Sequence, residues 1–143
     1  NEEKMILAGP AMIPDMPIYR NDNGNEFYVA FNSKGIERIN NKYFKRSNHK
    51  EFNIDHNPKD PANDCYVVQS FIINSELGIN TPKGFDPLPD GTWFIFVKVD
   101  NPDVWAKAKS GEIKGFSVEG IFNDKKIMDA EQSLLEKVKS IIK

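Results

Sequence analysis

The sequence predicts a single α+β or β-barrel domain, and three observations support this prediction. About six segments have the composition and period of strands, and most of them follow one another directly. Three further segments have the spacing of apolar residues that is typical of amphipathic helices. No internal repeat and no linker divides the 143 residues, a length that suits one domain with its own core. We therefore expect one domain over residues 1–143.

Composition and charge argue against several classes of protein. The apolar share of 39% and the aromatic share of 11% are those of a folded chain. The 19 Lys and Arg residues nearly balance 21 Asp and Glu residues, which argues against a protein that binds nucleic acid mainly through phosphates. The longest apolar run is far shorter than the ~20 residues that cross a bilayer, and no signal-peptide pattern is present. The single Cys65 cannot form an internal disulfide, so we expect a soluble protein of a reducing compartment.

The N-terminal third predicts two strands and a helix. Residues 4–13 are apolar enough for a strand, but Pro10 restricts that strand to a sheet edge or a bulge. The sequence "NDNG" at 21–24 is typical of a turn, and 26–31 is the strand that follows it. Residues 33–46 then change to a helical period. The apolar stripe of this helix consists of Ile36, Ile39, Tyr43 and Phe44.

The middle of the chain predicts two further strands and a long connection. Residues 50–57 alternate in the manner of a half-buried strand, and 58–64 have the composition of a loop. Residues 65–74 form the longest β-type run. Residues 75–91 are rich in Gly and Pro, and such a connection in a compact domain is often functional or mobile. The residues of 50–57 that share one face are Phe52, Ile54 and His56.

The segment 92–111 predicts a strand followed by a short helix. Alternate residues of 92–100 are apolar and lie on one face of the strand: Trp93, Ile95, Val97 and Val99. The helix covers 101–111 and has clear end signals. Asn101 is suited to its N-cap, Pro102 to its first position and Gly111 to its end.

The C-terminal part predicts one more strand and a final helix. The run "GEIKGFSVEG" at 111–120 is short, apolar and of an extended type. Residues 128–143 form an amphipathic helix that Asp129 caps. The apolar face of that helix consists of Leu134, Leu135, Val138, Ile141 and Ile142.

Ser117 is the first candidate for chemistry. Glu119 lies on the same face of the expected strand, ~7 Å away by strand geometry. The motif is not the G-x-S-x-G nucleophile elbow, because Gly120 comes one residue too late. The residues alone therefore leave two interpretations open: a polar strand face that meets water, or a nucleophile with a carboxylate nearby.

The two histidines and the single cysteine are the other candidates. His49 lies in a polar connection and is expected to be solvated, whereas His56 lies on an apolar face and is either a core histidine or a general base. Cys65 opens an apolar strand, where a buried and inert thiol is the commoner outcome, although a thiol nucleophile paired with His56 stays open. Asp55, Asp60 and His56 form a loose cluster whose spacing matches no metal motif. We predict no metal and no cofactor.

Three stretches taken together resemble a known family. They are "FNIDHNP" (52–58), "DCYVVQSFIIN" (64–74) and "PDGTWFIFVKVDNPDVWAKAKSGEIKGFSVEGIF" (89–122). Their order resembles the tailed-phage prohead proteases, which are capsid-maturation serine proteases related in fold to herpesvirus assemblin. The resemblance implies a mostly antiparallel β-barrel flanked by helices. It also implies that Ser117 is the nucleophile and His56 its general base.

The chain departs from the herpesvirus pattern at the third catalytic residue. Those enzymes use a second histidine after the serine, and this chain has no histidine after His56. The residue that orients the imidazole must therefore be a carboxylate, an amide or a backbone carbonyl. The candidates are Glu119, Glu76 and Asp64; Glu119 is favoured because it lies on the strand face of Ser117.

The resemblance implies a serine endopeptidase of phage capsid maturation. Its substrates would be the phage scaffold and major capsid proteins and the protease itself, inside the procapsid in the bacterial host cytoplasm. A homo-oligomer is compatible with this interpretation, whereas nucleic-acid and membrane partners are not expected. The rival interpretation is a catalytically inactive capsid-assembly or scaffold-binding module with the same fold. A third is a thiol enzyme based on Cys65.

Overall fold

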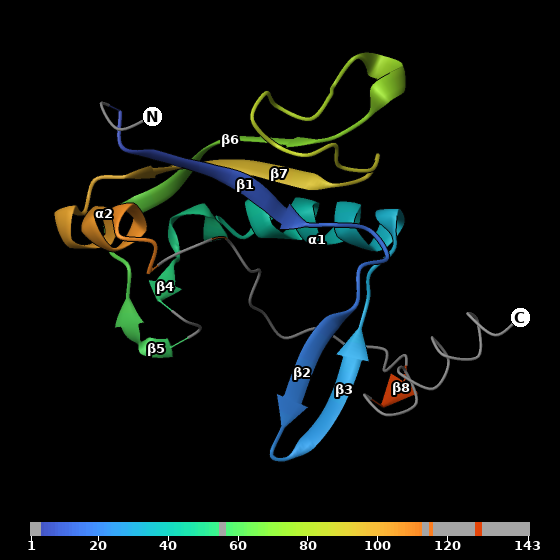
Figure 1. The fold of residues 1–143 in the computed structure, drawn as a ribbon, viewed down its shortest axis with the longest axis horizontal. Coiled ribbons are helices and arrows are strands. Elements are labelled where there is room, and N and C mark those ends of the chain that lie inside the picture. Colours follow the sequence, from blue (N-terminus) through green and yellow to red (C-terminus); the bar gives the residue numbers. More distant parts are fainter. Residues whose placement is uncertain (1–3, 55–56, 113–114, 116–127, 130–143) are drawn as a thin grey trace, which may run out of the picture.

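The computed structural model describes residues 4–54, 57–112, 115 and 128–129 (Figure 1). The strands are β1 (Ile6–Met12), β2 (Ile18–Asp22), β3 (Asn25–Val29), β4 (Asn53–Ile54), β5 (Asn57–Pro61), β6 (Cys65–Ile72), β7 (Trp93–Val99) and β8 (Met128–Asp129). The α-helices are α1 (Ser33–Lys45) and α2 (Pro102–Lys109). Two single-turn 3₁₀ helices are η1 (Asn48–Lys50) and η2 (Ser75–Leu77).

The strands of the described residues form three antiparallel sheets. The main sheet has the order β1-β7-β6, the second has β2-β3-β8, and β4 pairs with β5 alone. Within this part of the chain the sheets stay separate and do not close into a barrel. The α+β prediction is therefore confirmed, and the β-barrel is not.

The edge position predicted for the first strand is confirmed. β1 lies at one edge of the main sheet, and its register with β7 shifts between Pro10 and Met12. Proline lacks an N–H, so an edge or an irregularity is where a strand tolerates it. The local chemistry of Pro10 thus determines where this strand can lie.

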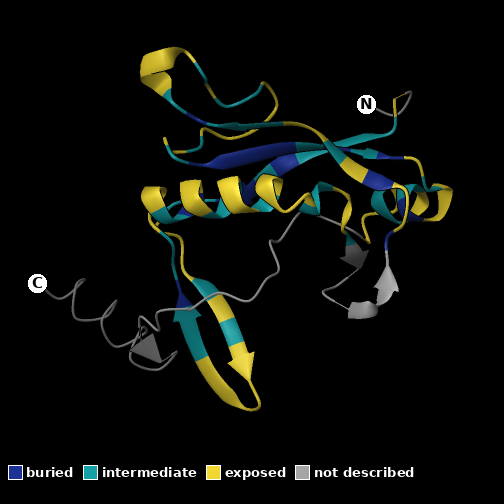
Figure 2. Ribbon diagram, turned by 180° about the vertical axis from the view of Figure 1, so that it is seen from behind, coloured by how far each residue is buried: buried dark blue, intermediate teal, exposed yellow. Residues whose placement is uncertain are grey.

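The hydrophobic core lies between the main sheet and the two helices. We call the sheet face covered by α1 and α2 the inner face (Figure 1). The predicted alternation of β7 is confirmed, because its inner-face residues are all buried. The buried core residues are Trp93, Ile95, Val97 and Val99 from β7, Ile36 from α1, Val104 from α2, and Ala11, Met12, Ala62 and Cys65. Figure 2 shows the same burial concentrated along β7 and the strand beside it.

Both helices begin at the residues that the sequence favours. The Asn32 side chain accepts a hydrogen bond from the backbone N–H of Gly35 at 2.8 Å, which caps α1. The Asn101 side chain accepts from the backbone N–H groups of Asp103 and Val104, and Pro102 follows it as the first helical residue. Each cap satisfies backbone donors that the first turn of a helix leaves without an intrahelical acceptor.

The β2–β3 hairpin projects away from the main sheet and carries many exposed residues (Figures 1 and 2). Its two-residue turn, Asn23–Gly24, has positive φ at both positions, as a type I′ hairpin turn requires. The predicted turn is therefore confirmed, but β2 before it was not predicted. β3 pairs on its other side with β8. Met128–Asp129, the first two residues of the expected C-terminal helix, are thus in a strand, and residues 130–143 lie outside the described residues.

The segment before β6 differs from its prediction. Residues 50–57 were expected to form one strand and 58–64 a loop, but β4 has only two residues and β5 occupies Asn57–Pro61. Two prolines argued against a strand there. β5 pairs with a single partner of two residues, so few of its backbone N–H groups are needed for a ladder. The remaining ties come from outside the strands, since the N–H of Ala62 donates to the carbonyl of Phe52 at 2.9 Å.

Candidate active site

The three residues expected to carry catalysis lie outside the described residues. They are Ser117, His56 and Glu119. Their positions in the sequence nevertheless connect them to described elements. His56 directly precedes β5, and Ser117 follows Gly115, which the structure describes as an exposed residue after α2. The geometry that can be given is that of the framework from which these two segments leave.

The two segments leave the framework at one place, which we call the corner, residues 62–65 and 99–101. Here β6 begins and β7 ends, with Cys65 paired opposite Val99. The backbone N–H of Asp100 donates to the carbonyl of Asp64 at 2.8 Å. β5 enters the corner from one side and α2 leaves it on the other. The segments that carry His56 and Ser117 are therefore attached to the same end of the main sheet.

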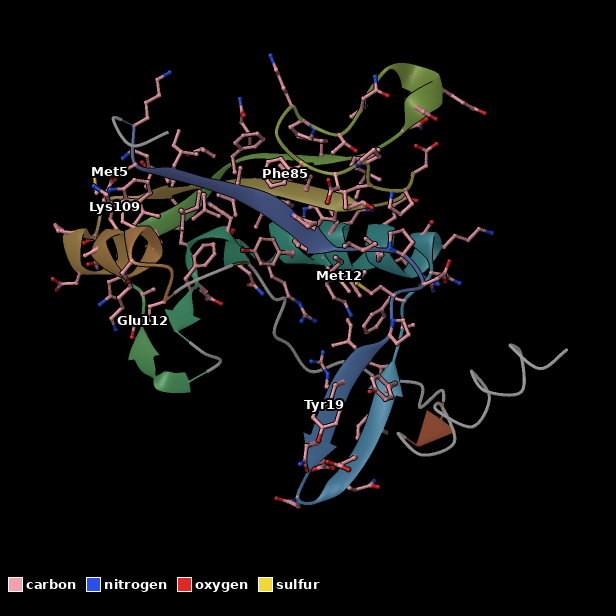
Figure 3. All side chains as sticks on the ribbon, in the orientation of Figure 1. Met5, Met12, Tyr19, Phe85, Lys109 and Glu112 are labelled. Atoms are coloured by element: carbon pink, nitrogen blue, oxygen red, sulfur yellow. The ribbon has the colours of Figure 1, made fainter. Side chains whose placement is uncertain are left out.

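Asn101 ties the two segments together at the corner. Its side-chain oxygen caps α2, and its side-chain N–H₂ group donates to the carbonyl of Asn63 at 3.2 Å. Asn63 is two residues beyond the end of β5. One side chain thus connects the start of α2 with the exit of the β4–β5 pair. Figure 3 labels Glu112 at the end of the described chain after α2, on the side of β4 and β5 in that view.

The corner is also fixed by the hydrophobic core. Ala62, Cys65 and Val99 are buried in one cluster with Val104 of α2. Phe52, just before β4, packs against this cluster. The base of both candidate segments is therefore held by burial as well as by hydrogen bonds.

Cys65 has the environment of an inert thiol. It is buried, and its Sγ lies 3.7 Å from the carbonyl oxygen of Asn63, which accepts its weak hydrogen bond. Burial raises the pKa of the Cys65 thiol, and the neighbouring carboxylates Asp64 and Asp100 raise it further. Because the thiolate is the reactive form, this environment disfavours a cysteine nucleophile. The expected inert, buried thiol is confirmed.

The carboxylates of the corner are exposed. The Lys98 ammonium contacts the Asp100 carboxylate at 2.7 Å, and hydrogen bonding from Lys98 lowers the pKa of Asp100. Asp64 adopts a left-handed backbone with φ of 60°, in the tight bend that leads into β6. Of the candidates for the third catalytic residue, Asp64 is the one that the structure places at the corner.

Glu76 lies at the opposite end of the main sheet. It belongs to η2, beyond the far end of β6. β6 has eight residues, which corresponds to ~26 Å of extended chain. The described end of the β4–β5 pair, at Asn57, lies on the other side of that distance (Figure 1). This arrangement argues against Glu76 as the partner of His56.

His49 is not solvated, contrary to its prediction. Its ring stacks on that of Phe44, with ring centroids 6.3 Å apart and planes 20° apart. Nδ1 of His49 is buried, and no hydrogen-bond partner for it is found among the described residues. The sequence showed the polar neighbours of His49 but not that η1 would turn the ring back onto α1.

The 75–91 connection is irregular, as predicted, and held by its own contacts. The Asp90 carboxylate accepts two hydrogen bonds from Ser75, one from its backbone N–H at 3.0 Å and one from its hydroxyl at 2.7 Å. Phe85 packs edge-on against Phe94 of β7 at 5.0 Å, and Figure 3 shows Phe85 on the side of the sheet away from α1. At Gly91, φ is 92° and a Cβ atom would lie 2.9 Å from that of Ser33. Only glycine fits where the connection returns to the sheet.

The described residues offer little for a metal or a membrane. Among them, no three His, Cys, Asp or Glu side chains are grouped closely enough to hold a metal ion. Asp55 and His56, members of the loose acidic cluster, lie outside this part of the chain. No helix in the described ranges has the length and apolar character to cross a membrane.

Comparison with known proteins gives one match. The family described as "Putative phage serine protease XkdF" matches residues 1–126. No curated protein and no solved structure matches the chain. Since the match covers most of the 143 residues, the chain belongs to this phage serine protease family. The resemblance to phage serine proteases is thereby confirmed, while the relation to herpesvirus assemblin stays a prediction.

Proposed function

We propose that this member of the phage serine protease family is a serine endopeptidase of capsid maturation, with Ser117 as its nucleophile and His56 as its general base. The family match over residues 1–126 is the observation that carries the proposal, because it includes both residues. The corner adds support, since it attaches the two segments to the same end of the main sheet. A serine and a histidine distant in sequence can act together only if their segments share such a base.

The reaction follows from the roles of the two residues. The Ser117 hydroxyl oxygen attacks the substrate carbonyl carbon while the His56 imidazole takes the hydroxyl proton. The imidazolium then gives that proton to the leaving amine, the peptide C–N bond breaks, and an acyl-Ser117 ester remains. Water, activated by the same imidazole, hydrolyses the ester and restores the free hydroxyl. Two proton transfers through one imidazole thus split a difficult hydrolysis into two easier steps.

Glu119 is the proposed third residue. A carboxylate beside the imidazole would hold it in one tautomer and stabilise the imidazolium, and losing such a carboxylate can cost ~10⁴-fold in rate. Asp64 is the alternative, because the structure places it at the corner. Glu119→Gln and Asp64→Asn, compared side by side, distinguish the two assignments. The variant with the larger loss of rate identifies the third residue.

The proposed substrates are the phage scaffold and major capsid proteins and the protease itself, inside the procapsid in the bacterial host cytoplasm. Homo-oligomers are compatible with this setting. The alternative is an inactive assembly or scaffold-binding module of the same fold. The absence of a histidine after His56, where the herpesvirus enzymes have one, is the observation that favours this alternative.

Labelling with a fluorophosphonate probe tests the proposal, because the probe needs an activated serine but no known substrate. We expect one adduct per chain, mapped to Ser117 by peptide mass spectrometry, and its loss in Ser117→Ala and His56→Ala. Ser33→Ala and His49→Gln are the matched controls and should keep the adduct. Correctly folded protein without an adduct would support the inactive module. An adduct that disappears in a Cys65→Ser variant and persists in Ser117→Ala would support a thiol enzyme.

A further inference from the structure

The two edges of the main sheet differ in how they are protected. In the described residues, β1 and β6 each pair with β7 alone, so each has one edge without a strand partner. The β1 edge contains Pro10 and a shift of register, two features that hinder the addition of another strand. β6 contains no proline over its eight residues. The edge of β6 is therefore the one that can accept an added strand.

The exposed side chains of β6 adjoin a shallow apolar hollow. The register between β6 and β7 shifts between Val67 and Gln69, and Val68 at this shift is 43% exposed. The hollow lies on the outer face of the sheet, opposite α1, and has a volume of about 390 Å³. Its lining residues are Lys4, Ile6, Ala8, Val68, Gln69 and Phe96.

The position of β6 relates this edge to the candidate active site. β6 begins at Cys65 in the corner, where the segments carrying His56 and Ser117 are attached. A chain paired along β6 would therefore have one end at the corner. Its alternate side chains would point to the outer face, beside Val68 and the hollow. An extended peptide meets both requirements, because its main chain bonds to the edge and alternate side chains meet a pocket.

We propose that the free edge of β6 binds the substrate of this protease as an extended strand, with an apolar side chain of the peptide in the hollow beside Val68. The proposal rests on the proposed function and deepens it, because it names the substrate-binding element and the residue that sets a preference. The partner is a flexible peptide segment with an apolar residue a few positions from the cleaved bond.

Val68→Lys tests this inference, and Leu77→Lys is its matched control. A lysine at Val68 places a charge in the hollow and on the edge, a substitution that blocks strand addition. Leu77 is 71% exposed in η2, at the far end of the sheet, so the control adds the same charge elsewhere. Two readouts are needed: the rate of labelling by the fluorophosphonate probe, and cleavage of a peptide library made by digesting a bacterial lysate.

The expected result separates substrate binding from the nucleophile. Val68→Lys should be labelled at the rate of the unaltered protein, while its kcat/KM for library peptides falls by about tenfold or more, mainly through KM. Leu77→Lys should change neither readout. Unchanged cleavage in Val68→Lys, or an equal loss in both variants, would overturn the inference. Absence of labelling in the unaltered protein would overturn the proposed function instead.

Hydrogen exchange tests the edge even without catalysis. In Ser117→Ala, addition of the peptide library should slow amide exchange in β6 and leave β1 unchanged. Protection at β1, or at neither strand, would overturn the inference. Protection of β6 that increases with protein concentration in the absence of peptide would overturn it in favour of a second copy of the chain on this edge.

Discussion

The two faces of the main sheet are built from the same three strands and differ in what covers them. The inner face packs against α1 and α2, and its β7 residues are all buried. The outer face carries a group of aromatic rings, Phe71, Phe94 and Phe96, of which Phe94 is covered by Phe85 from the 75–91 connection. Beyond that cover lies the open hollow beside β6. One face therefore supplies stability, and the other leaves room for a partner.

The largest expected effect comes from emptying the inner face. Ile36 is fully buried between α1 and the sheet. Ile36→Ala should lower the free energy of unfolding by about 2–5 kcal/mol, through lost burial and the cavity left behind. Urea denaturation at constant m-value measures this change. Leu77→Ala, at an exposed site, should stay within about 0.5 kcal/mol; an equal effect at both sites would contradict the difference between the faces.

A smaller effect is expected on the outer face. Phe85→Ala removes the ring that packs edge-on against Phe94, but Phe85 is partly exposed already. We expect a loss of about 1–2 kcal/mol in urea denaturation, from partial burial and the lost aromatic pair. A loss as large as that of Ile36→Ala would mean that the outer face is as important for stability as the inner face.

The next effect concerns the corner, where α2 joins the inner face. Asn101→Ala removes the cap of α2 and the hydrogen bond to Asn63, and should cost about 1 kcal/mol of stability. Asn101→Asp keeps a capping oxygen and loses only the donor to Asn63. If the link between the segments positions the site, Asn101→Asp should keep most of the stability but slow labelling by the fluorophosphonate probe. Unchanged labelling would confine Asn101 to a structural role.

The smallest effect at neutral pH is that of Tyr43→Phe. Tyr43 contacts Trp93 on the inner face with ring centroids 5.2 Å apart, and burial raises the pKa of its hydroxyl from 10.0 to about 12. A raised pKa in the folded state gives stability that is complete below pH 10 and is lost as the pH rises through about 12. The unaltered protein should therefore lose more stability between these values than Tyr43→Phe. Parallel urea midpoints for the two proteins would contradict this.

The parts of the fold that the sequence predicted well are those set by local pattern. The alternation of β7, the stripe of α1 and the cap of α2 all depend on residues close together in the chain, and each is confirmed. The misses depend on tertiary partners. β5 is stabilised by pairing with β4, and the ring of His49 is buried by a turn that brings it onto Phe44. No periodicity in the sequence encodes such contacts.

The candidate site depends still more on tertiary structure. His56 and Ser117 were chosen from a resemblance, because neither a lone histidine nor a strand serine distinguishes catalysis from packing. Their pairing stays a prediction, since both lie outside the described residues. The corner could not be foreseen from the sequence, because Asn101 looked like a helix cap alone. Its second bond, to Asn63, joins residues 38 positions apart.

The pH dependence of labelling by the fluorophosphonate probe tests the central claim most directly. If His56 activates Ser117, the second-order labelling rate of the unaltered protein should rise as an imidazole loses its proton, near pH 6.5, and then level off. In His56→Ala the rate should be far lower and should show no such step. A rate that climbs steadily with hydroxide concentration in both proteins, or an adduct at a residue other than Ser117, would contradict the account.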